Sequence, residues 1–480
     1  MEQVEPVTLI DGLRSATWHR HEAFERLPFV NAMVEGTLPL ESYIAQLRGL
    51  AVILSAVEQA LIQSRDPQFD GVMPFIKSRF EMLSADLAFF AQRLVPDILP
   101  AVRLSLAFAR EIRSLPAKSS GRLIGFLYVL QGTTRGNQVH LPDITRCFNL
   151  QDAEGVLFYR GFGAATDASW EEFRTIINGT ADEIEEQAVS GAIRIYDVLE
   201  RFHEALYPLH DGNFGFTATA LNPEAGDHPV PQNPKILQAA LRAGRRCHEE
   251  FSYYELRYGE RGRRFTDSDA AWLAALADQP VEVVADQVLW LGRVLSARGM
   301  PFILLERQLV LLAEELEVGS NTEALQTVIA DLRQQRFNTV SQSRFDEVCC
   351  SVAKLLSPTS AAKCPDLPLI LVAAHADAVA GTPECLSSLI SWLKSSSIMT
   401  DEELEAVQKF ISTEGYLGLG TLAVQEIDRA GLGRQGAEMV TAVLKEGNAK
   451  NAVPLFPKVT KKKSNPSVAK RIGISLTISD

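Results

Sequence analysis

The sequence lacks the cysteine spacing of a disulfide framework or a zinc site. Its six cysteines include no Cys-x-x-Cys pair, so we expect reduced thiols. The first residues carry neither the basic nor the apolar region of a secretion signal. The sequence also has no run of about 18 uncharged apolar residues that could span a bilayer. These absences predict a cytoplasmic protein without a membrane span.

Clustered positive charge is missing as well. Lys and Arg number 47 against 60 Asp and Glu, which gives a formal net charge of -13. Affinity for phosphate backbones needs clustered cations, so nucleic acid is excluded as the main partner. The chain shows no Gly-x-Gly-x-x-Gly in a strand–turn–helix setting that would bind a flavin or nicotinamide, and no cysteine cluster for iron and sulfur. Electrons for any redox chemistry must therefore come from outside.

The pattern that is present is helical, with apolar residues at helical spacing and no convincing β alternation. A chain of 480 residues predicts two or three domains. Residues 211–234 are dense in Gly, Pro and Asn and are predicted to be a linker. We therefore expect an all-α protein with a helical domain at 1–210, a second helical region at 235–452 and a flexible basic tail at 453–480.

Within the first domain, the spacing predicts helices over 8–26, 41–62, 69–93, 101–113 and 120–141. A capping-box pattern from Ser169 to Glu172 predicts the start of one long helix that continues to about residue 206.

The first of these helices carries a histidine on its apolar face. His21 follows Thr17 by one turn, so the helix period points it inward. A lone histidine on such a face is more often a core residue than a ligand. Glu25, however, is four residues further on the same face, and a carboxylate that takes the Nδ1 proton leaves Nε2 free to bind a metal. Arg14 lies two turns back, roughly 10 Å along the axis, so a large flat anion across this helix could contact both ends.

A pair of glycines interrupts the predicted helix at 120–141. Gly132 and Gly136 are one turn apart, and each costs about 1 kcal/mol of helix stability relative to Ala. Two interpretations stay open: close packing against another helix, or a bulky planar ligand lying against bare backbone. One helix with an axial histidine and one with a glycine face would together sandwich a porphyrin.

The order and spacing of these residues resemble the heme oxygenase family, particularly its bacterial, biliverdin-producing branch, over about residues 8–206. The resemblance rests on Leu13, Arg14, Ala16, Thr17, His21 and Glu25, then Phe29 and Val30, then Gly36, Thr37 and Leu38, then Leu127 to Leu130 followed by Gly132 and Gly136.

The resemblance implies a role for each candidate residue. His21 would be the proximal heme ligand, Glu25 the group that orients it, and Gly132 and Gly136 part of a flexible distal helix that passes over the iron. It also implies that Arg14 and Arg160 lie near heme propionates; for Arg160 a solvated loop cation is the alternative.

Two positions depart from the family pattern. The better-known animal enzymes have an aspartate that holds proton-delivering waters where this chain has Thr133, and a hydroxyl is not a carboxylate. Asn137 stands where a second adjacent glycine is common. Both changes bear on efficiency and regiochemistry more than on heme binding.

The implied activity is that of an oxidoreductase that uses heme as both cofactor and substrate, with biliverdin, carbon monoxide and ferrous iron as products. Its electrons would come from a ferredoxin or an NADPH-dependent reductase. The second half would bind a partner, accept the bilin or bring the reductase close, and its sequence does not choose among these roles. A non-enzymatic heme-binding or heme-sensing protein is the alternative, and a di-iron oxidase is disfavoured because the first domain has no convincing Glu-x-x-His pair.

Overall fold

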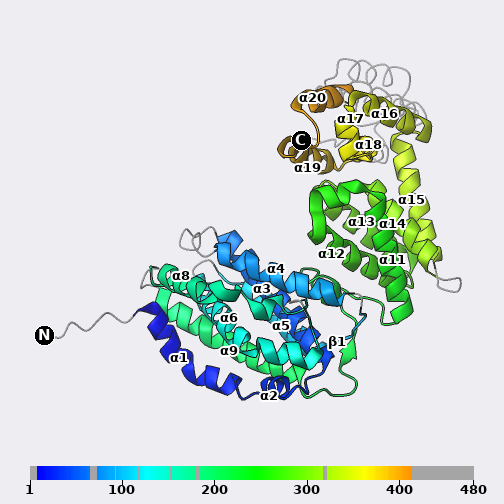
Figure 1. Ribbon diagram of the computed structural model, residues 1–480. Helices are drawn as coiled ribbons and strands as arrows, with labels where there is room; N and C mark the ends of the chain where they lie inside the picture. Colours follow the sequence, from blue (N-terminus) through cyan, green and yellow to red (C-terminus); the bar gives the residue numbers. More distant parts are fainter. Residues whose placement is uncertain are drawn as a thin grey trace, which may run out of the picture. The chain divides into compact units, whose positions relative to one another are not determined.

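The computed structural model describes residues 8–64, 73–91, 93–116, 119–151, 154–179, 184–316 and 322–411, with 73–78 described by backbone alone. The predicted basic tail at 453–480 lies outside these residues. The chain divides into two compact units, Met1–Pro234 and Lys235–Asp480 (Figure 1). In the described residues nearly all regular structure is α-helix, which confirms the predicted all-α class.

Unit 1 is a helical domain with one very short sheet. Strand β1 (Asp97–Ile98) pairs antiparallel with β2 (Phe214–Gly215). The segment 211–234, whose composition predicts a linker, contains β2 and the short helix α10 (Ala218–Leu221). The remaining helices are α1 (Leu9–Phe24), α2 (Pro28–Glu35), α3 (Leu40–Ser64), α4 (Met73–Phe90), α5 (Leu99–Arg113), α6 (Gly121–Phe148), α7 (Leu157–Arg160), α8 (Thr166–Asn178) and α9 (Glu185–Leu206), with a 3₁₀ turn at Gly163–Ala165.

Helix α1 begins where its sequence provides a cap. The Thr8 side chain accepts a hydrogen bond from the amide of Asp11, and the Asp11 carboxylate accepts one from the amide of Thr8, which makes a capping box. Ile10, Leu13 and Thr17 are buried on one face. The Thr17 hydroxyl donates to the Leu13 carbonyl at 2.8 Å, so this polar residue is satisfied within the helix.

Helix α3 forms the centre of unit 1. By length and composition alone, this helix of 25 residues could cross a membrane. However, 78% of its most apolar window is buried inside the fold, between helices that include α4 and α5. A core helix passes the same test, so this feature is weak evidence for a membrane span.

Helices α6 and α9 pack side by side (Figure 1). Two glycines let their backbones come close. A Cβ on Gly125 would collide with the backbone of Ala188 and Ala192 and lie 2.9 Å from the carbonyl carbon of Gly191, and a Cβ on Gly191 would lie 3.0 Å from the Cα of Arg122. Helix α6 continues through Pro142, beyond the predicted end at 141. Ile144, two residues later, is fully buried, and that burial offsets the hydrogen bond that proline removes.

The predicted long helix from 169 to 206 is wrong. Helix α8 ends at Asn178, and α9 begins at Glu185. The capping box predicted at Ser169 is also wrong, because α8 already starts at Thr166. Gly161 and Gly163 adopt positive φ angles of 55° and 59° that turn the chain early.

Unit 2 has its own hydrophobic core. The sequence Thr400-Asp401-Glu402-Glu403 has the spacing of a capping box and predicts a helix start there. The final described helix of unit 2 does begin with this box, in which the side chains of Thr400 and Glu403 each accept a hydrogen bond from the other's backbone amide. The helices are α11 (Pro234–Glu250), α12 (Ser252–Leu276), α13 (Val281–Ala297), α14 (Phe302–Glu315), α15 (Glu323–Thr339), α16 (Gln342–Leu355), α17 (Pro358–Lys363), α18 (Leu367–Val379), α19 (Pro383–Ser395) and α20 (Asp401–Phe410).

Candidate functional site

Unit 1 contains a pocket of about 430 Å³ that lies between α1 and α6. Helices α2, α3, α7, α8 and α9 complete its walls. Pockets of a few hundred Å³ with mostly apolar walls and a few polar groups are typical of cofactor sites. Of the residues predicted from the sequence, the pocket brings together Arg14, His21, Glu25, Gly132, Thr133 and Gly136.

His21 stands at the pocket with nearly half of its side chain exposed, at 47%. Its Nδ1 atom lies 3.8 Å from Oε1 of Glu25, which is within ion-pair range but too long for a hydrogen bond. The other ring nitrogen, Nε2, is not used by this contact and is the atom available to a metal. His19, two residues earlier, is 96% exposed and does not line the pocket.

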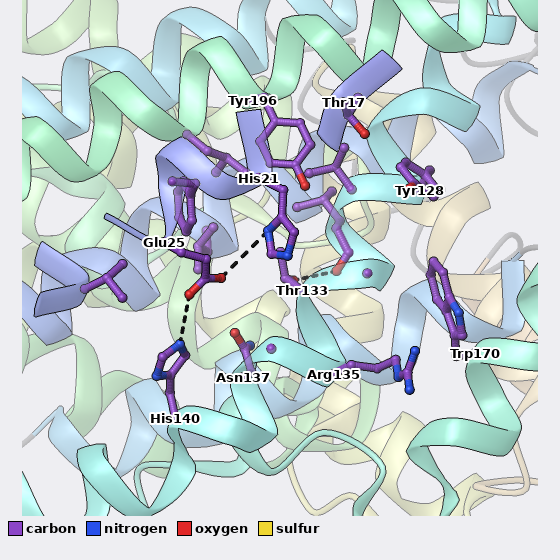
Figure 2. A pocket seen from close by; sticks show the side chains of 18 of the residues that line it. Thr17, His21, Glu25, Tyr128, Thr133, Arg135, Asn137, His140, Trp170 and Tyr196 are labelled. Carbon is purple, nitrogen blue, oxygen red and sulfur yellow. Dashed lines mark hydrogen bonds and ion pairs between the residues drawn. The ribbon is translucent and has the colours of Figure 1, made fainter. Parts of the chain in front are cut away.

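Glu25 has a second partner, which is not predicted from the sequence. Figure 2 shows its carboxylate between His21 and His140, which lies on α6. Nε2 of His140 is 3.4 Å from Oε2 of Glu25. The hydrogen bond from His140 holds the pKa of Glu25 below its ordinary value, and the same bond raises the pKa of His140.

Neither of the two predicted glycines packs closely against the backbone of another helix. A Cβ on Gly132 would come no closer than 3.8 Å to Trp170, which is ordinary van der Waals contact. A Cβ on Gly136 would meet no described atom within 4 Å outside its own helix. Close helix packing is found instead at Gly125, further back on α6. The structure thus favours the interpretation that bare backbone at Gly132 and Gly136 leaves room for a ligand.

The hydroxyl of Thr133, which lies between these glycines, is hydrogen-bonded within the protein. Its hydroxyl donates to the Leu130 carbonyl at 2.7 Å and lies 3.5 Å from Nη2 of Arg79. Arg79 itself is 1% exposed and also donates to the Leu130 carbonyl. Burial lowers the pKa of Arg79 to about 9. The Thr133 hydroxyl therefore has its proton committed to the helix and can act toward the pocket only as an acceptor.

The inner wall of the pocket is a satisfied hydrogen-bond chain. The Tyr159 hydroxyl donates to Oε1 of Gln46 at 2.8 Å, and Nε2 of Gln46 lies 2.9 Å from Nε2 of His203. Nδ1 of His203 donates to the Leu199 carbonyl at 2.7 Å, which makes Nε2 the acceptor for Gln46. Burial lowers the pKa of His203 to about 4, so this imidazole is neutral. Such a closed network holds the wall in one arrangement.

Arginines line the pocket from three helices: Arg14 of α1, Arg135 of α6 and Arg174 of α8. The Arg14 guanidinium lies 5.5 Å from the Trp18 ring. Arg135 and Arg174 each pair with an exposed acidic neighbour, at 2.9 and 3.0 Å. Exposed pairs of this kind are weak and exchange readily, so the three cations can receive acidic groups of a ligand.

Arg160 is not brought into the site. Its side chain is exposed, and it is not among the described residues that line the pocket. Its carbonyl accepts a hydrogen bond from Nε2 of Gln138 at 3.0 Å. Through this bond α6 holds Arg160, the last residue of α7. Its role at a propionate stays a prediction from the resemblance.

Several residues that line the pocket are not predicted from the sequence. His140 follows Gly136 by one turn, so its place on the glycine face could be deduced from helical spacing alone. Arg135 and Arg174 carry no local pattern that separates them from solvated cations. Gln46 and His203 meet from helices that are 157 positions apart in the chain, and no short motif reports such a contact.

Comparisons with known proteins agree with the resemblance. Residues 7–203 match the model of the heme oxygenase family. A curated relative from Porphyra purpurea, named heme oxygenase, is 27% identical over 158 residues, which cover 32% of this chain. The match spans 65% of that relative's length, slightly less than two thirds.

Two solved structures are also similar to part of the chain. A heme oxygenase from Leptospira interrogans is 19% identical, with a TM-score of 0.35, over 41% of this chain and 99% of that protein. Heme oxygenase-1 from the cyanobacterium Synechocystis, solved in complex with heme, is 21% identical, with a TM-score of 0.35, over 42% of this chain and 93% of that protein.

Proposed function

Because residues 7–203 match the heme oxygenase family, we propose that unit 1 binds heme and cleaves it with dioxygen and external electrons. The proposed products are biliverdin, carbon monoxide and ferrous iron. One observation supports this proposal most directly. His21 on α1 and the glycine face of α6 line one pocket, and a Cβ on Gly136 would meet only open space there.

The residues of the pocket fit a heme group. His21 offers an Nε2 atom that its contact with Glu25 leaves free. The bare backbone at Gly132 and Gly136 lines the α6 side of the pocket and would leave room there for a ligand. Arg14 and the other lining arginines match the two acidic groups that a porphyrin carries. When bound, heme would supply the iron at which dioxygen is reduced.

The chain's own residues would then bind the heme, orient its histidine ligand and shield the pocket from water. Glu25 would accept a hydrogen bond from the Nδ1–H of His21, which would increase the basicity of Nε2. The apolar walls and the Tyr159, Gln46 and His203 chain keep water from the inner side of the pocket. Thr133 presents a hydroxyl oxygen that can accept a hydrogen bond from a water on the distal side.

The electrons must be delivered by another protein. We propose a ferredoxin or an NADPH-dependent reductase as the donor, because the sequence predicts no strand–turn–helix site for a flavin or nicotinamide and has no cysteine cluster for iron and sulfur. The partly exposed side chain of His21 supports this proposal, since it places the site near the surface where a donor can approach.

A second candidate function is heme binding or sensing without turnover. It is favoured by Thr133, whose hydroxyl donates to the Leu130 carbonyl and is not a carboxylate. A neutral hydroxyl holds water less firmly than a charged group does, so proton delivery is the step most affected.

Aerobic turnover on the full chain separates the two candidates. Heme, a ferredoxin-type reducing system and air are supplied, and the products are identified. Biliverdin absorbance together with carbon monoxide release supports the enzyme. A heme spectrum that persists without either product supports the binding protein and overturns the proposed activity.

A further inference from the structure

His140 joins the two sides of the pocket through one carboxylate. It lies one turn beyond Gly136 on α6, whereas His21 and Glu25 lie on α1. Oε2 of Glu25 is 3.4 Å from Nε2 of His140, and Oε1 is 3.8 Å from Nδ1 of His21. The carboxylate thus stands between two imidazoles from two helices, as Figure 2 shows.

The direction of the hydrogen bond follows from the chemistry of the pair. An ionised carboxylate only accepts, so His140 must be the donor to Glu25. Asp143 is the competing acceptor, but its Oδ2 lies further away, 3.9 Å from Nδ1 of His140. Its other oxygen accepts a hydrogen bond from Arg146 at 2.8 Å. Glu25 is therefore the nearer acceptor for His140.

The hydrogen bond from His140 is important for Glu25 because the Glu25 side chain is only partly buried. The Glu25 side chain is 40% exposed, whereas that of His140 is 18% exposed. Of the described residues, His140 is the one whose hydrogen bond reaches this carboxylate. Without that bond a half-exposed glutamate gains rotamer freedom by turning into solvent. Its contact with His21 would then be made for a smaller fraction of the time.

We propose that His140 is a positioning residue that acts through Glu25 on His21. It holds the carboxylate toward Nδ1 of His21, so that this atom carries the proton and Nε2 faces the pocket as an acceptor. The role of His21 as heme ligand rests on the proposed function. The hydrogen-bond relay from His140 to His21 can be tested without heme, because it is a property of the protein's own side chains.

The first test measures the tautomer of His21 in the heme-free full chain. Nitrogen-15 NMR of histidine-labelled protein distinguishes protonation at Nδ1 from protonation at Nε2. At one fixed pH, His140→Leu should shift His21 away from the Nδ1-protonated form, whereas His140→Gln, which keeps an N–H donor, should retain it. His19→Leu is the matched control on the exposed face of α1. An unchanged His21 tautomer in His140→Leu overturns the proposal.

The second test uses the ferrous, heme-loaded protein and resonance Raman spectroscopy. The iron–histidine stretching frequency should fall in His140→Leu, in the same direction as in Glu25→Gln and by a smaller amount, and stay near the wild-type value in His140→Gln. Circular dichroism confirms folding, and His140→Ala replaces the leucine variant if that variant unfolds. A frequency equal to that of wild type in both the leucine and alanine variants contradicts the relay.

The two tests separate the inference from the function on which it rests. If the wild-type protein shows no iron–histidine band, the proposed ligand role of His21 fails. The tautomer measurement on the heme-free protein then still decides whether His140 positions His21.

Discussion

Gly125 of α6 packs backbone to backbone against Gly191 of α9, with 2.9 Å between the position of a Cβ on Gly125 and the carbonyl carbon of Gly191. About three turns later on the same helix, Gly136 faces open pocket space. Two glycines of one helix therefore serve opposite purposes. The first lets two helices approach, and the second leaves a surface uncovered.

Replacing each glycine by alanine should change stability in opposite directions. Gly125→Ala would force its Cβ against the α9 backbone, and overpacking of this kind costs about 1–3 kcal/mol. Gly136→Ala should stabilise the heme-free protein by about 1 kcal/mol, because alanine favours the helix and meets nothing. Urea unfolding followed by circular dichroism measures both. A destabilised Gly136→Ala variant would contradict the open space.

A larger side chain at the second glycine should block the ligand instead of the fold. Gly136→Leu would place its side chain in the pocket, so we expect a folded protein whose heme affinity is at least ten-fold lower, about 1.4 kcal/mol. Heme titration followed by absorbance gives the affinity. Val139→Leu, which adds bulk to the same helix at a position that is 72% exposed, is the control and should bind heme normally. Full affinity in Gly136→Leu would rule out a heme surface at this glycine.

Loss of the Thr133 hydroxyl should impair turnover while heme binding remains. In Thr133→Val, Nη2 of Arg79 loses an acceptor, which we expect to cost about 1 kcal/mol of stability, and the distal side loses its hydrogen-bond acceptor for water. Carbon monoxide release per heme is the measurement. The matched control is Thr134→Val, because the Thr134 hydroxyl is buried without a hydrogen-bond partner among the described residues. Equal turnover in the two valine variants would show that the Thr133 hydroxyl has no part in the reaction.

In unit 2, the pH dependence of stability should report the carboxylate of Glu403. It accepts hydrogen bonds from the amides of Ser357 and Thr400, at 2.6 and 2.8 Å. Desolvation opposes the charge, but these bonds prevail and lower the pKa of Glu403 to about 2, from an ordinary 4.5. A depressed folded-state pKa stabilises the protein above the unfolded value, and this contribution is lost as the pH falls from 4.5 toward about 2.

Thermal unfolding of Glu403→Gln tests this directly. The variant should melt below the wild type at neutral pH, and the difference should shrink as the pH falls through that range. Glu402→Gln, on the exposed side of the same first helical turn, should melt close to the wild type both at neutral pH and at acid pH. A gap for Glu403→Gln that stays constant with pH would mean that the carboxylate charge is not the stabilising feature.

Local signals in the sequence were sufficient for much of the fold. The capping box at Thr400 and the helical face that carries His21 are set by residues within a turn or two, and both are found where the spacing predicts them. The capping box predicted at Ser169 failed for the opposite reason. The turns at Gly161 and Gly163 and the bonds from Gln138 on α6 begin that helix early, and these are tertiary effects.

The candidate site shows the same division. Helical spacing places Arg14, His21 and Glu25 on one face, and all three line the pocket. The spacing of Gly132 and Gly136 could not decide between helix packing and a ligand surface, because the answer depends on where α9 approaches. The contact of His140 with Glu25 joins residues 115 positions apart, so only the folded structure brings it to view.

The heme spectrum of His21→Ala tests the proposed site most directly. We predict that the variant loses the histidine-ligated spectrum of the wild type and that added imidazole restores it, because the small ligand can occupy the space that the missing ring leaves. Binding of heme with an unchanged spectrum, both before and after imidazole, would show that His21 is not the ligand.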